Sequence, residues 1–243
     1  FIASTFRSGG ALTTRMLNAH SQIGMTVDKL KFFLFCYERN VPLNKEKLKE
    51  ILEGVSSRLE TRYKIDINCQ TCLDELMLHP ITWASLYSVL MEEIHKKEDK
   101  KNILGELEGV SWTNIPDFLE MFPKGKACIM LRDLRDVLVS FKKNTIAPAD
   151  DYLVAIYNLI DIMDHCYKYQ ERYGDRFHCI RYEALKADPE TEMRKMCVFL
   201  GVDYEPTMIR DENWMEGDKP WVNHQVSSFY KEGDFQNPVG RWR

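Results

Sequence analysis

A short loop near the start of the chain combines residue types that bind an anion. The apolar residues 1–6 are interrupted by Arg7-Ser8-Gly9-Gly10, and apolar residues at helical spacing follow. Glycines let the backbone direct its N–H groups at an anion, and a helix that starts there adds about 1 kcal/mol. Arg7 adds a full positive charge. The loop predicts a phosphate site, and an ordinary strand-to-helix turn is an equal alternative.

A second candidate phosphate site follows an apolar run in the middle of the chain. Residues 127–131 lead directly into residues 132–136, which contain two arginines and two aspartates. Ser140 lies two helical turns further on, so Arg132 and Ser140 could reach one phosphate together. The alternative interpretation is a helix start capped by Asp133, with arginines that pair with surface acids.

Helices and strands alternate along the chain and would carry both sites. Apolar residues recur every three or four positions in five predicted helices, at 45–59, 81–95, 111–121, 152–169 and 190–200. Short continuous apolar runs predict strands at 1–6, 102–107, 127–131 and 177–181. This alternation predicts one α/β domain over residues 1–243 with a mainly parallel sheet. Ligands of such sheets bind beyond the carboxyl ends of the strands, where both candidate sites fall.

Composition argues against several kinds of partner. The 243 residues carry a formal net charge of −4, so no overall positive field would attract nucleic acid or an anionic membrane. No apolar stretch reaches the roughly 18 residues that span a bilayer, and the first residues lack the charged region of a signal peptide. The seven cysteines are odd in number, and several lie in apolar runs. We therefore expect a cytoplasmic protein with reduced thiols that binds neither nucleic acid nor membrane.

The cysteine and histidine patterns of this chain are incomplete as metal-binding motifs. Cys69-Gln70-Thr71-Cys72 has the spacing of half a zinc ribbon, but no second pair follows. The six histidines show no His-x-x-x-His spacing. We therefore predict no metal site.

Five motifs, in order, resemble those of the sulfotransferases that use 3'-phosphoadenosine 5'-phosphosulfate (PAPS), in particular the bacterial type. They are Arg7-Ser8-Gly9, Arg132 with Ser140, Ile180-Arg181-Tyr182-Glu183-Ala184-Leu185 with Ala187-Asp188-Pro189, Phe199-Leu200-Gly201-Val202 with Tyr204-Glu205-Pro206, and Gly240-Arg241-Trp242-Arg243. The resemblance implies a three-layer α/β/α fold with a P-loop-like start. It also implies transfer of a sulfuryl group from PAPS to a hydroxyl or amine of a small-molecule acceptor, with release of 3'-phosphoadenosine 5'-phosphate (PAP).

The resemblance assigns roles to individual residues. Arg7 takes the place of a catalytic lysine or arginine, while Arg132 and Ser140 hold the 3'-phosphate. Tyr182 contacts the adenine. The cradle of the 5'-phosphosulfate consists of Ser8, Gly9, Gly10, Ala11, Leu12, Thr13 and Thr14. A late loop that closes on the 3'-phosphate is represented by Lys231, Gly240 and Arg241.

Two departures from the family pattern concern the donor site. Relatives carry hydroxyl residues after the loop glycine, where this chain has Gly10 and Ala11. Many bacterial relatives carry a lysine where this chain has Leu107. Backbone N–H groups remain as donors, and Thr13 or Thr14 could reach back from the first helical turn. The departures motivate an alternative function, a catalytically inactive module that binds PAP or PAPS.

The acceptor must lose a proton, and a carboxylate that takes it contributes roughly 10²–10⁴-fold to the rate. Asp28 lies close to where relatives carry a glutamate and is the first choice for this base. Its alternative role is the N-cap of a helix that starts at Lys29. Glu108 lies near the position of a histidine in other members and is the second choice. Glu106 would bind a backbone group or a neighbouring arginine.

Two sets of residues indicate different acceptors. A cationic acceptor would suit an acidic cavity formed by Asp66, Asp74, Glu75, Glu106 and Glu108. A planar or apolar acceptor would suit the aromatic residues Phe32, Phe33, Trp214 and Trp221. The polar segment 211–236 is long enough to act as a lid. A P-loop kinase shares the start of the chain, but it requires a Gly-Lys-Ser/Thr sequence that is missing here.

Overall fold

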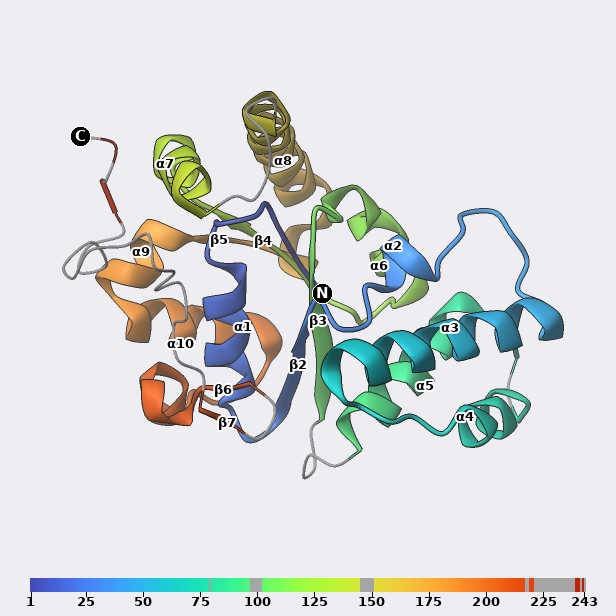
Figure 1. Cartoon of the computed structure of the whole chain (residues 1–243). Coiled ribbons are helices and arrows are strands. Elements are labelled where there is room, and N and C mark those ends of the chain that lie inside the picture. Colours follow the sequence, from blue (N-terminus) through green and yellow to red (C-terminus); the bar gives the residue numbers. More distant parts are fainter. Residues whose placement is uncertain are drawn as a thin grey trace.

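One five-stranded sheet organises the protein (Figure 1). This computed structural model describes residues 1–78, 80–96, 102–144, 151–216, 219–220, 239–240 and 242. The strands of the sheet are β1 (Ile2–Ser4), β2 (Ile23–Val27), β3 (Ile103–Gly109), β4 (Ala127–Leu131) and β5 (Phe177–Arg181). Their order is β2-β3-β1-β4-β5, and every neighbouring pair is parallel. The predicted α/β class with a parallel sheet is confirmed, and β2 is a strand that the apolar runs did not predict.

Helices connect the strands in the described part of the chain. They are α1 (Gly10–Asn18), α2 (Phe32–Phe35), α3 (Lys45–Tyr63), α4 (Cys69–Leu76), α5 (Trp83–His95), α6 (Ile115–Met121), α7 (Leu134–Asn144), α8 (Asp151–Tyr173), α9 (Tyr182–Ala187) and α10 (Pro189–Leu200). Local signals account for several ends. The Asn44 side chain accepts the Lys47 N–H at 2.8 Å before α3, and Gly201 ends α10 with φ 79°.

The sheet separates two apolar cores, because successive side chains of a strand point to opposite faces. On β1, Ile2 packs in a core with residues of α1, α9 and α10. Phe1 and Ala3 pack in the other core, with residues of α5, α6 and α8. Figure 1 shows α1, α9 and α10 on one side of the sheet and the helices α3 to α5 on the other. The predicted three-layer α/β/α architecture is confirmed.

The strand register brings the candidate residues to one edge of the sheet. Ser4 at the end of β1 pairs with Gly109 of β3 and with Met130 of β4. Leu131 pairs with Arg181 at the end of β5. The segments that follow these strands therefore meet at the carboxyl edge, where parallel sheets bind their ligands.

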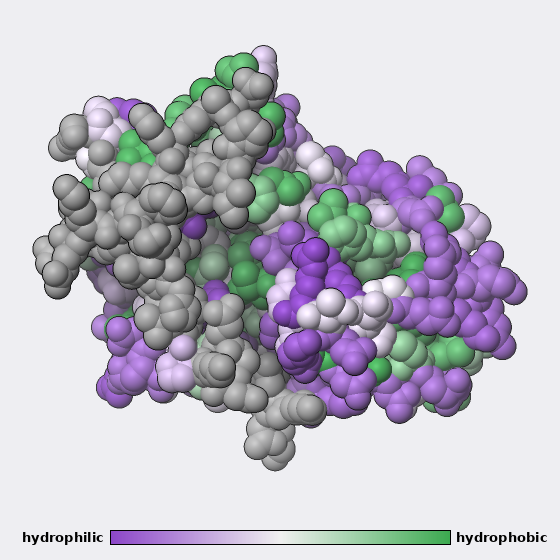
Figure 2. Space-filling view, viewed as in Figure 1, coloured by the Kyte–Doolittle hydropathy of each residue, from purple (hydrophilic) through white to green (hydrophobic). Residues whose placement is uncertain are grey.

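Two segments lie outside this central frame. The helices α3 to α5 are inserted between β2 and β3, and Figure 2 shows mainly hydrophilic residues over the outer surface of this insert. In the predicted lid, β6 (Met215–Glu216) pairs antiparallel with β7 (Lys219–Pro220). Residues 221–236 of the predicted lid, with Trp221, lie outside the described residues. Among the helices described, none combines the length and apolar character needed to cross a membrane.

Candidate active site

The loop after β1 is shaped by two positive backbone angles and a contact between hydroxyls. Arg7 has φ 69° and Gly9 has φ 97°, values that are uncommon for residues with a side chain. The hydroxyls of Thr5 and Ser8 are hydrogen-bonded to each other, and the Ser8 N–H donates to the Thr5 carbonyl at 3.4 Å. The chain thus turns back directly before α1, which places the predicted cradle at the amino end of this helix.

The backbone of α1, rather than its side chains, can bind an anion in the cradle. The N-cap is Gly9, which has no side chain that could accept a hydrogen bond from the helix. The first N–H groups of a helix have no acceptor inside the helix. The hydroxyls of Thr13 and Thr14 donate to backbone carbonyls four residues earlier, at 3.3 and 2.9 Å. Ala11 and Leu12 pack against an apolar core. These four side chains are therefore engaged within the fold.

Side chains at positions 9 and 10 would collide with their neighbours. A Cβ atom at Gly9 would lie 2.3 Å from a ring carbon of Tyr182. A Cβ atom at Gly10 would lie 2.7 Å from the Ser4 hydroxyl and 2.9 Å from a methyl group of Leu107. The two departures from the family pattern at Gly10 and Leu107 are therefore neighbours in space, because Leu107, together with Ser4, occupies the space that a side chain at position 10 would need.

Replacing Gly10 with alanine is expected to lower the free energy of unfolding by about 1–3 kcal/mol, the usual cost of overpacking. Leu107→Ala opens space beside position 10, so the double variant should lose at least about 1 kcal/mol less than the sum of the two single losses. Gly54→Ala in α3 is the matched control, because a Cβ atom there meets no atom within 4 Å. Urea unfolding measures the free energy of unfolding of the four variants and of the wild type. Strictly additive losses would show that Leu107 does not crowd position 10.

Four residues predicted for the donor site meet at the carboxyl edge of the sheet. The Arg7 Nε donates to the Ser140 hydroxyl at 3.0 Å, and the Arg132 Nη1 donates to the Arg7 carbonyl at 2.8 Å. The Arg132 guanidinium lies 4.4 Å from the centre of the Tyr182 ring, which also lies against Gly9. Two guanidinium groups and the amino end of α1 are thus held together, a combination that favours phosphate binding.

The carboxy-terminal motif is anchored beside this cluster. The Gly240 N–H donates to the carboxylate of buried Asp136 at 2.7 Å. The Arg135 guanidinium lies 3.4 Å from the centre of the Trp242 ring. Both partners belong to the first turn of α7, which lies between Arg132 and Ser140 of the predicted 3'-phosphate site. Asp136 is a residue that the motif search overlooked, because an aspartate at a helix start is a common cap. Two residues predicted for the same loop lie outside the described residues, namely Lys231 and Arg241.

The alternative interpretation of residues 132–136, in which an arginine pairs with a surface acid, holds for Arg135 and Asp133. The Asp133 carboxylate accepts hydrogen bonds from the guanidinium and the backbone N–H of Arg135, which lower the pKa of Asp133 to about 2. Arg132 points to the loop after β1 instead. A surface ion pair and a predicted phosphate ligand therefore occur side by side in this segment.

Asp28 lies directly after β2 and fastens this strand to β3. Its carboxylate accepts the Gly109 N–H at 3.1 Å and lies 3.5 Å from the Lys31 ammonium. Its carbonyl accepts hydrogen bonds from the side chains of Arg58 and Tyr63. The next helix, α2, has Lys31 as its N-cap, so the alternative role of Asp28 as an N-cap is wrong. The Asp28 side chain is 31% exposed and remains accessible to an acceptor.

Glu106 and Glu108 are buried and hold the start of α2. Glu106 accepts two backbone N–H groups there, at 3.0 and 3.4 Å, which is the backbone role predicted for it. Glu108 accepts the Phe33 N–H at 3.1 Å and the Ser111 hydroxyl at 2.7 Å. Burial raises the pKa of Glu108, and burial with the neighbouring Glu108 charge raises the pKa of Glu106 to about 8. Both oxygens of Glu108 are therefore occupied beneath α2.

Comparison with known proteins identifies the chain. Residues 1–206 match the sequence profile of the sulfotransferase family. The chain belongs to this family and is a sulfotransferase. The match includes the loop after β1, the segment with Arg132 and Ser140, and Tyr182. No curated protein matches the sulfotransferase in a sequence search.

Solved structures share the fold of this sulfotransferase. The sulfotransferase domain of the Synechococcus PCC 7002 olefin synthase superposes with a TM-score of 0.55 at 18% identity, over 89% of this chain and 76% of its own. The sulfotransferase domain from the curacin biosynthetic pathway gives 0.53 at 21% identity, over 89% and 77%. A sulfotransferase from Alicyclobacillus acidocaldarius gives 0.50 at 17% identity, over 90% and 86%. At these identities, the likeness concerns the fold alone.

An apolar surface adjoins the sulfotransferase loop on the side of Asp28. Phe6 directly precedes Arg7 and is 52% exposed. Its ring and the Asp28 carboxylate both lie near Gly109, 3.6 and 3.7 Å from the position that a Cβ atom would take there. Beyond Phe6 lies a cavity of about 180 Å³, lined by Thr5, Phe6, Val137, Val154, Ala155, Asn158 and Leu159. The motif comparison missed Phe6, although an aromatic residue before a cationic loop is a visible signal.

Several residues that the sequence proposes for the acceptor cavity have other places. Phe32 and Phe33 belong to the buried core, so they do not line an open cavity. The Trp214 indole donates to the Met208 carbonyl at 3.0 Å. Asp74 lies on α4 in the helical insert. Among the described residues, no cluster of three or more His, Cys, Asp or Glu side chains is arranged to hold a metal ion.

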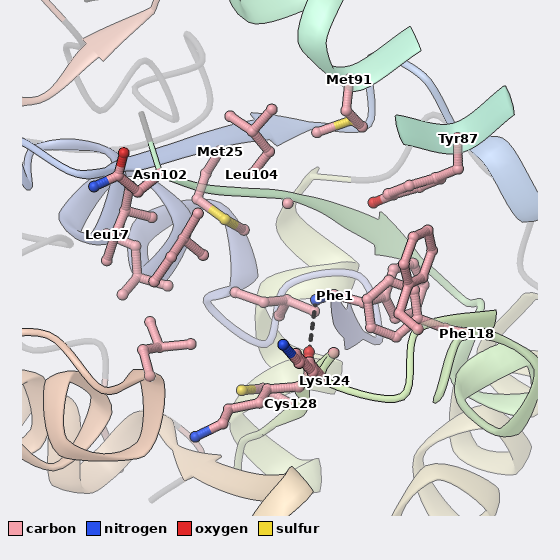
Figure 3. Close-up of a pocket in the computed structure, with 18 of the residues that line it drawn as sticks. Phe1, Leu17, Met25, Tyr87, Met91, Asn102, Leu104, Phe118, Lys124 and Cys128 are labelled. Carbon is pink, nitrogen blue, oxygen red and sulfur yellow. Dashed lines mark hydrogen bonds between the residues drawn. The ribbon is translucent and has the colours of Figure 1, made fainter. Parts of the chain in front are cut away.

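A further cavity, of about 660 Å³, lies at the amino ends of the strands (Figure 3). Apolar side chains such as Leu17, Met25 and Leu104 form much of its wall, and the Phe1 backbone nitrogen donates to the Lys126 carbonyl beside it. None of the predicted donor-site residues belongs to the lining described. The cavity is therefore separate from the candidate active site of the sulfotransferase, which occupies the opposite edge of the sheet.

Proposed function

We propose that this sulfotransferase transfers a sulfuryl group from PAPS to a hydroxyl or amine of a small-molecule acceptor and releases PAP. The contact of Arg7 with Ser140 at 3.0 Å is the observation that carries the proposal. It unites the two predicted phosphate motifs, which are 133 positions apart in the chain. A donor with phosphates at both its 5' and 3' ends requires two such motifs at one edge.

The charges of the cluster suit the two ends of PAPS. The 5'-phosphosulfate is assigned to the amino end of α1, where the helix dipole and Arg7 favour negative charge. The 3'-phosphate is assigned to Arg132 and Ser140, on the adjacent segment after β4. The Tyr182 ring lies against the Arg132 guanidinium and is largely buried, and we assign the adenine to a contact with Tyr182.

In the proposed reaction the acceptor oxygen or nitrogen attacks the sulfur in line with the bond to the 5'-phosphate. The new bond to sulfur forms as the sulfur–oxygen bond to the phosphate breaks, and the electron pair leaves with PAP. Asp28 accepts the acceptor proton. Arg7 stabilises the charge that develops on the leaving phosphate, a contact that counts toward rate because it strengthens in the transition state.

The surface beside Asp28 supports an acceptor with an apolar or aromatic body. Such a body would lie on exposed Phe6 and against Val137 and Val154, with the attacking group between Arg7 and Asp28. A cationic acceptor is less well supported, because Glu106 and Glu108 of the predicted acidic cavity bind the backbone of α2. All seven cysteines are free thiols, so the proposal includes a cytoplasmic location.

PAP binding tests the donor assignment. PAP at about 100 times its dissociation constant should add about 2.7 kcal/mol to the free energy of unfolding, whereas AMP at the same concentration should add far less because it lacks the 3'-phosphate. Thermal shift measures both, and Arg132→Ala should abolish the PAP effect. Arg194→Ala is the matched control, because Arg194 is exposed and pairs with Glu190 on α10. Equal shifts with PAP and AMP, or no shift with either, would refute the assignment.

A further inference from the structure

The helix α8 is apolar on two opposite faces. Its inner face contributes Ala155, Leu159, Ile162, Cys166 and Tyr169 to buried positions. Its outer face exposes five large side chains, Leu153 at 63%, Tyr157 at 71%, Ile160 at 57%, Met163 at 54% and Tyr167 at 69%. A helix that covers a core on one face normally carries polar residues on the other, and one that is apolar all round is normally buried. The outer face of α8 therefore has the composition of an interface.

These five residues are spaced symmetrically about Ile160, whereas Val154, which is also exposed at 56%, belongs to the cavity beside Phe6. Tyr157 and Met163 lie three positions before and after it, and Leu153 and Tyr167 lie seven positions before and after it. A two-fold axis perpendicular to α8 at Ile160 would therefore place Tyr157 level with Met163 of a second copy, and Leu153 level with Tyr167 of that copy. Ile160 would meet its own counterpart. Self-complementarity of this kind is what a two-fold interface requires.

We propose that the outer face of α8 is a homodimer interface, in which two copies of α8 pack antiparallel about a two-fold axis at Ile160. In Figure 2 apolar residues lie exposed at the top of the molecule, where Figure 1 places α8. The charged groups near the stripe do not oppose the contact, because the Lys168 ammonium pairs with the Asp164 carboxylate of the same helix at 2.5 Å. The cavity of about 180 Å³ beside Phe6 is lined by residues from another side of α8, so the interface leaves this cavity open.

The available area sets the strength of this dimer. With the axis at Ile160, two copies of α8 overlap over residues 151–169, a length of about 28 Å. A strip about 10–12 Å wide along this length covers about 280–340 Å² per copy, and the total of about 550–700 Å² is below the 1,200–2,000 Å² of a standard stable interface. We therefore expect a weak dimer that dissociates on dilution.

Sedimentation velocity at protein concentrations from about 1 to 100 µM tests the interface. The wild type should shift from monomer to dimer over this range, and Ile160→Asp should raise the dissociation constant at least about tenfold by placing two carboxylates on the axis. Val198→Asp is the matched control, since Val198 is an exposed apolar residue on another helix, at 81%. A monomer at every concentration, or a dimer unaffected by Ile160→Asp, would overturn the proposal. Circular dichroism checks that both variants remain folded.

Cysteine cross-linking tests the position of the axis. A disulfide requires Cα atoms about 4.4–6.8 Å apart, which only residues on the axis can satisfy with their own counterparts. Ile160→Cys should therefore form a covalent dimer under mild oxidation. Tyr167→Cys should not, because seven residues displace it about 10 Å from the axis. The wild type supplies the baseline for the native thiols. Cross-linking through position 167 and not through position 160 would refute the proposed symmetry.

Discussion

Replacing Arg7 with alanine is expected to lower kcat by about 10²–10³-fold, the usual cost of removing one donor to a developing negative charge. The guanidinium is held by its contact with the Ser140 hydroxyl at 3.0 Å, so it is oriented before the donor binds. Preorganisation of this kind costs nothing at the moment of reaction. The carbonyl that accepts from Arg132 belongs to the backbone of Arg7, so the variant keeps that part of the donor site.

Kinetics with radiolabelled PAPS and a screened phenol or alcohol acceptor would measure this effect. PAP should still stabilise Arg7→Ala in thermal shift, because Arg132 and the amino end of α1 remain. Arg7→Lys should recover part of kcat, since it restores the charge without the planar fork. Arg194→Ala, which removes an exposed arginine, should behave as the wild type. Full activity in Arg7→Ala would remove Arg7 from the reaction.

Asp28→Asn is expected to lower kcat by about 10²–10⁴-fold, the range attributed to a positioned base. The substitution preserves the local structure, because the amide oxygen can still accept the Gly109 N–H. The backbone of Asp28 has φ 52°, a conformation in which asparagine is enriched. A loss of activity with an unchanged melting temperature would therefore report proton transfer rather than folding.

Glu108→Gln separates the two candidates for the base. Glu108 is fully buried and accepts hydrogen bonds from Phe33 and Ser111, so its replacement should lower stability through α2. The folded fraction of Glu108→Gln should keep kcat within about tenfold of the wild type, because its carboxylate does not face the acceptor surface. The reverse result, with Asp28→Asn active and Glu108→Gln inactive, would assign the base to Glu108.

Periodicity and motif order were sufficient for the central frame of the protein. Continuous apolar runs identified β1, β3, β4 and β5, since both faces of a parallel strand are covered and no alternation is required. Gly24 and Thr26 interrupt the apolar residues of β2. The search for continuous apolar runs therefore did not detect this strand. Motif spacing similarly identified Arg7, Arg132, Ser140 and Tyr182, which the fold brings together.

Side-chain partners across the sheet could not be predicted in the same way. Asp28 and Glu106 are both carboxylates, yet Asp28 is partly exposed beside Phe6, whereas Glu106 is buried against the start of α2. Leu107 explains the glycine at position 10 only when their distance is known. Contacts of this kind depend on the strand register and on the helix that covers each carboxylate, and neither is encoded in local spacing.

The sequence by itself determined the parallel α/β class, the family and the residues that carry positive charge to the donor site, because these depend on local periodicity and on the order of short motifs. Only the tertiary structure decided which carboxylate remains accessible, that Ser4 and Leu107 crowd position 10, and that α8 presents a second apolar face. The physical reason is that burial and contact are properties of packed neighbours, which come from segments far apart in the chain.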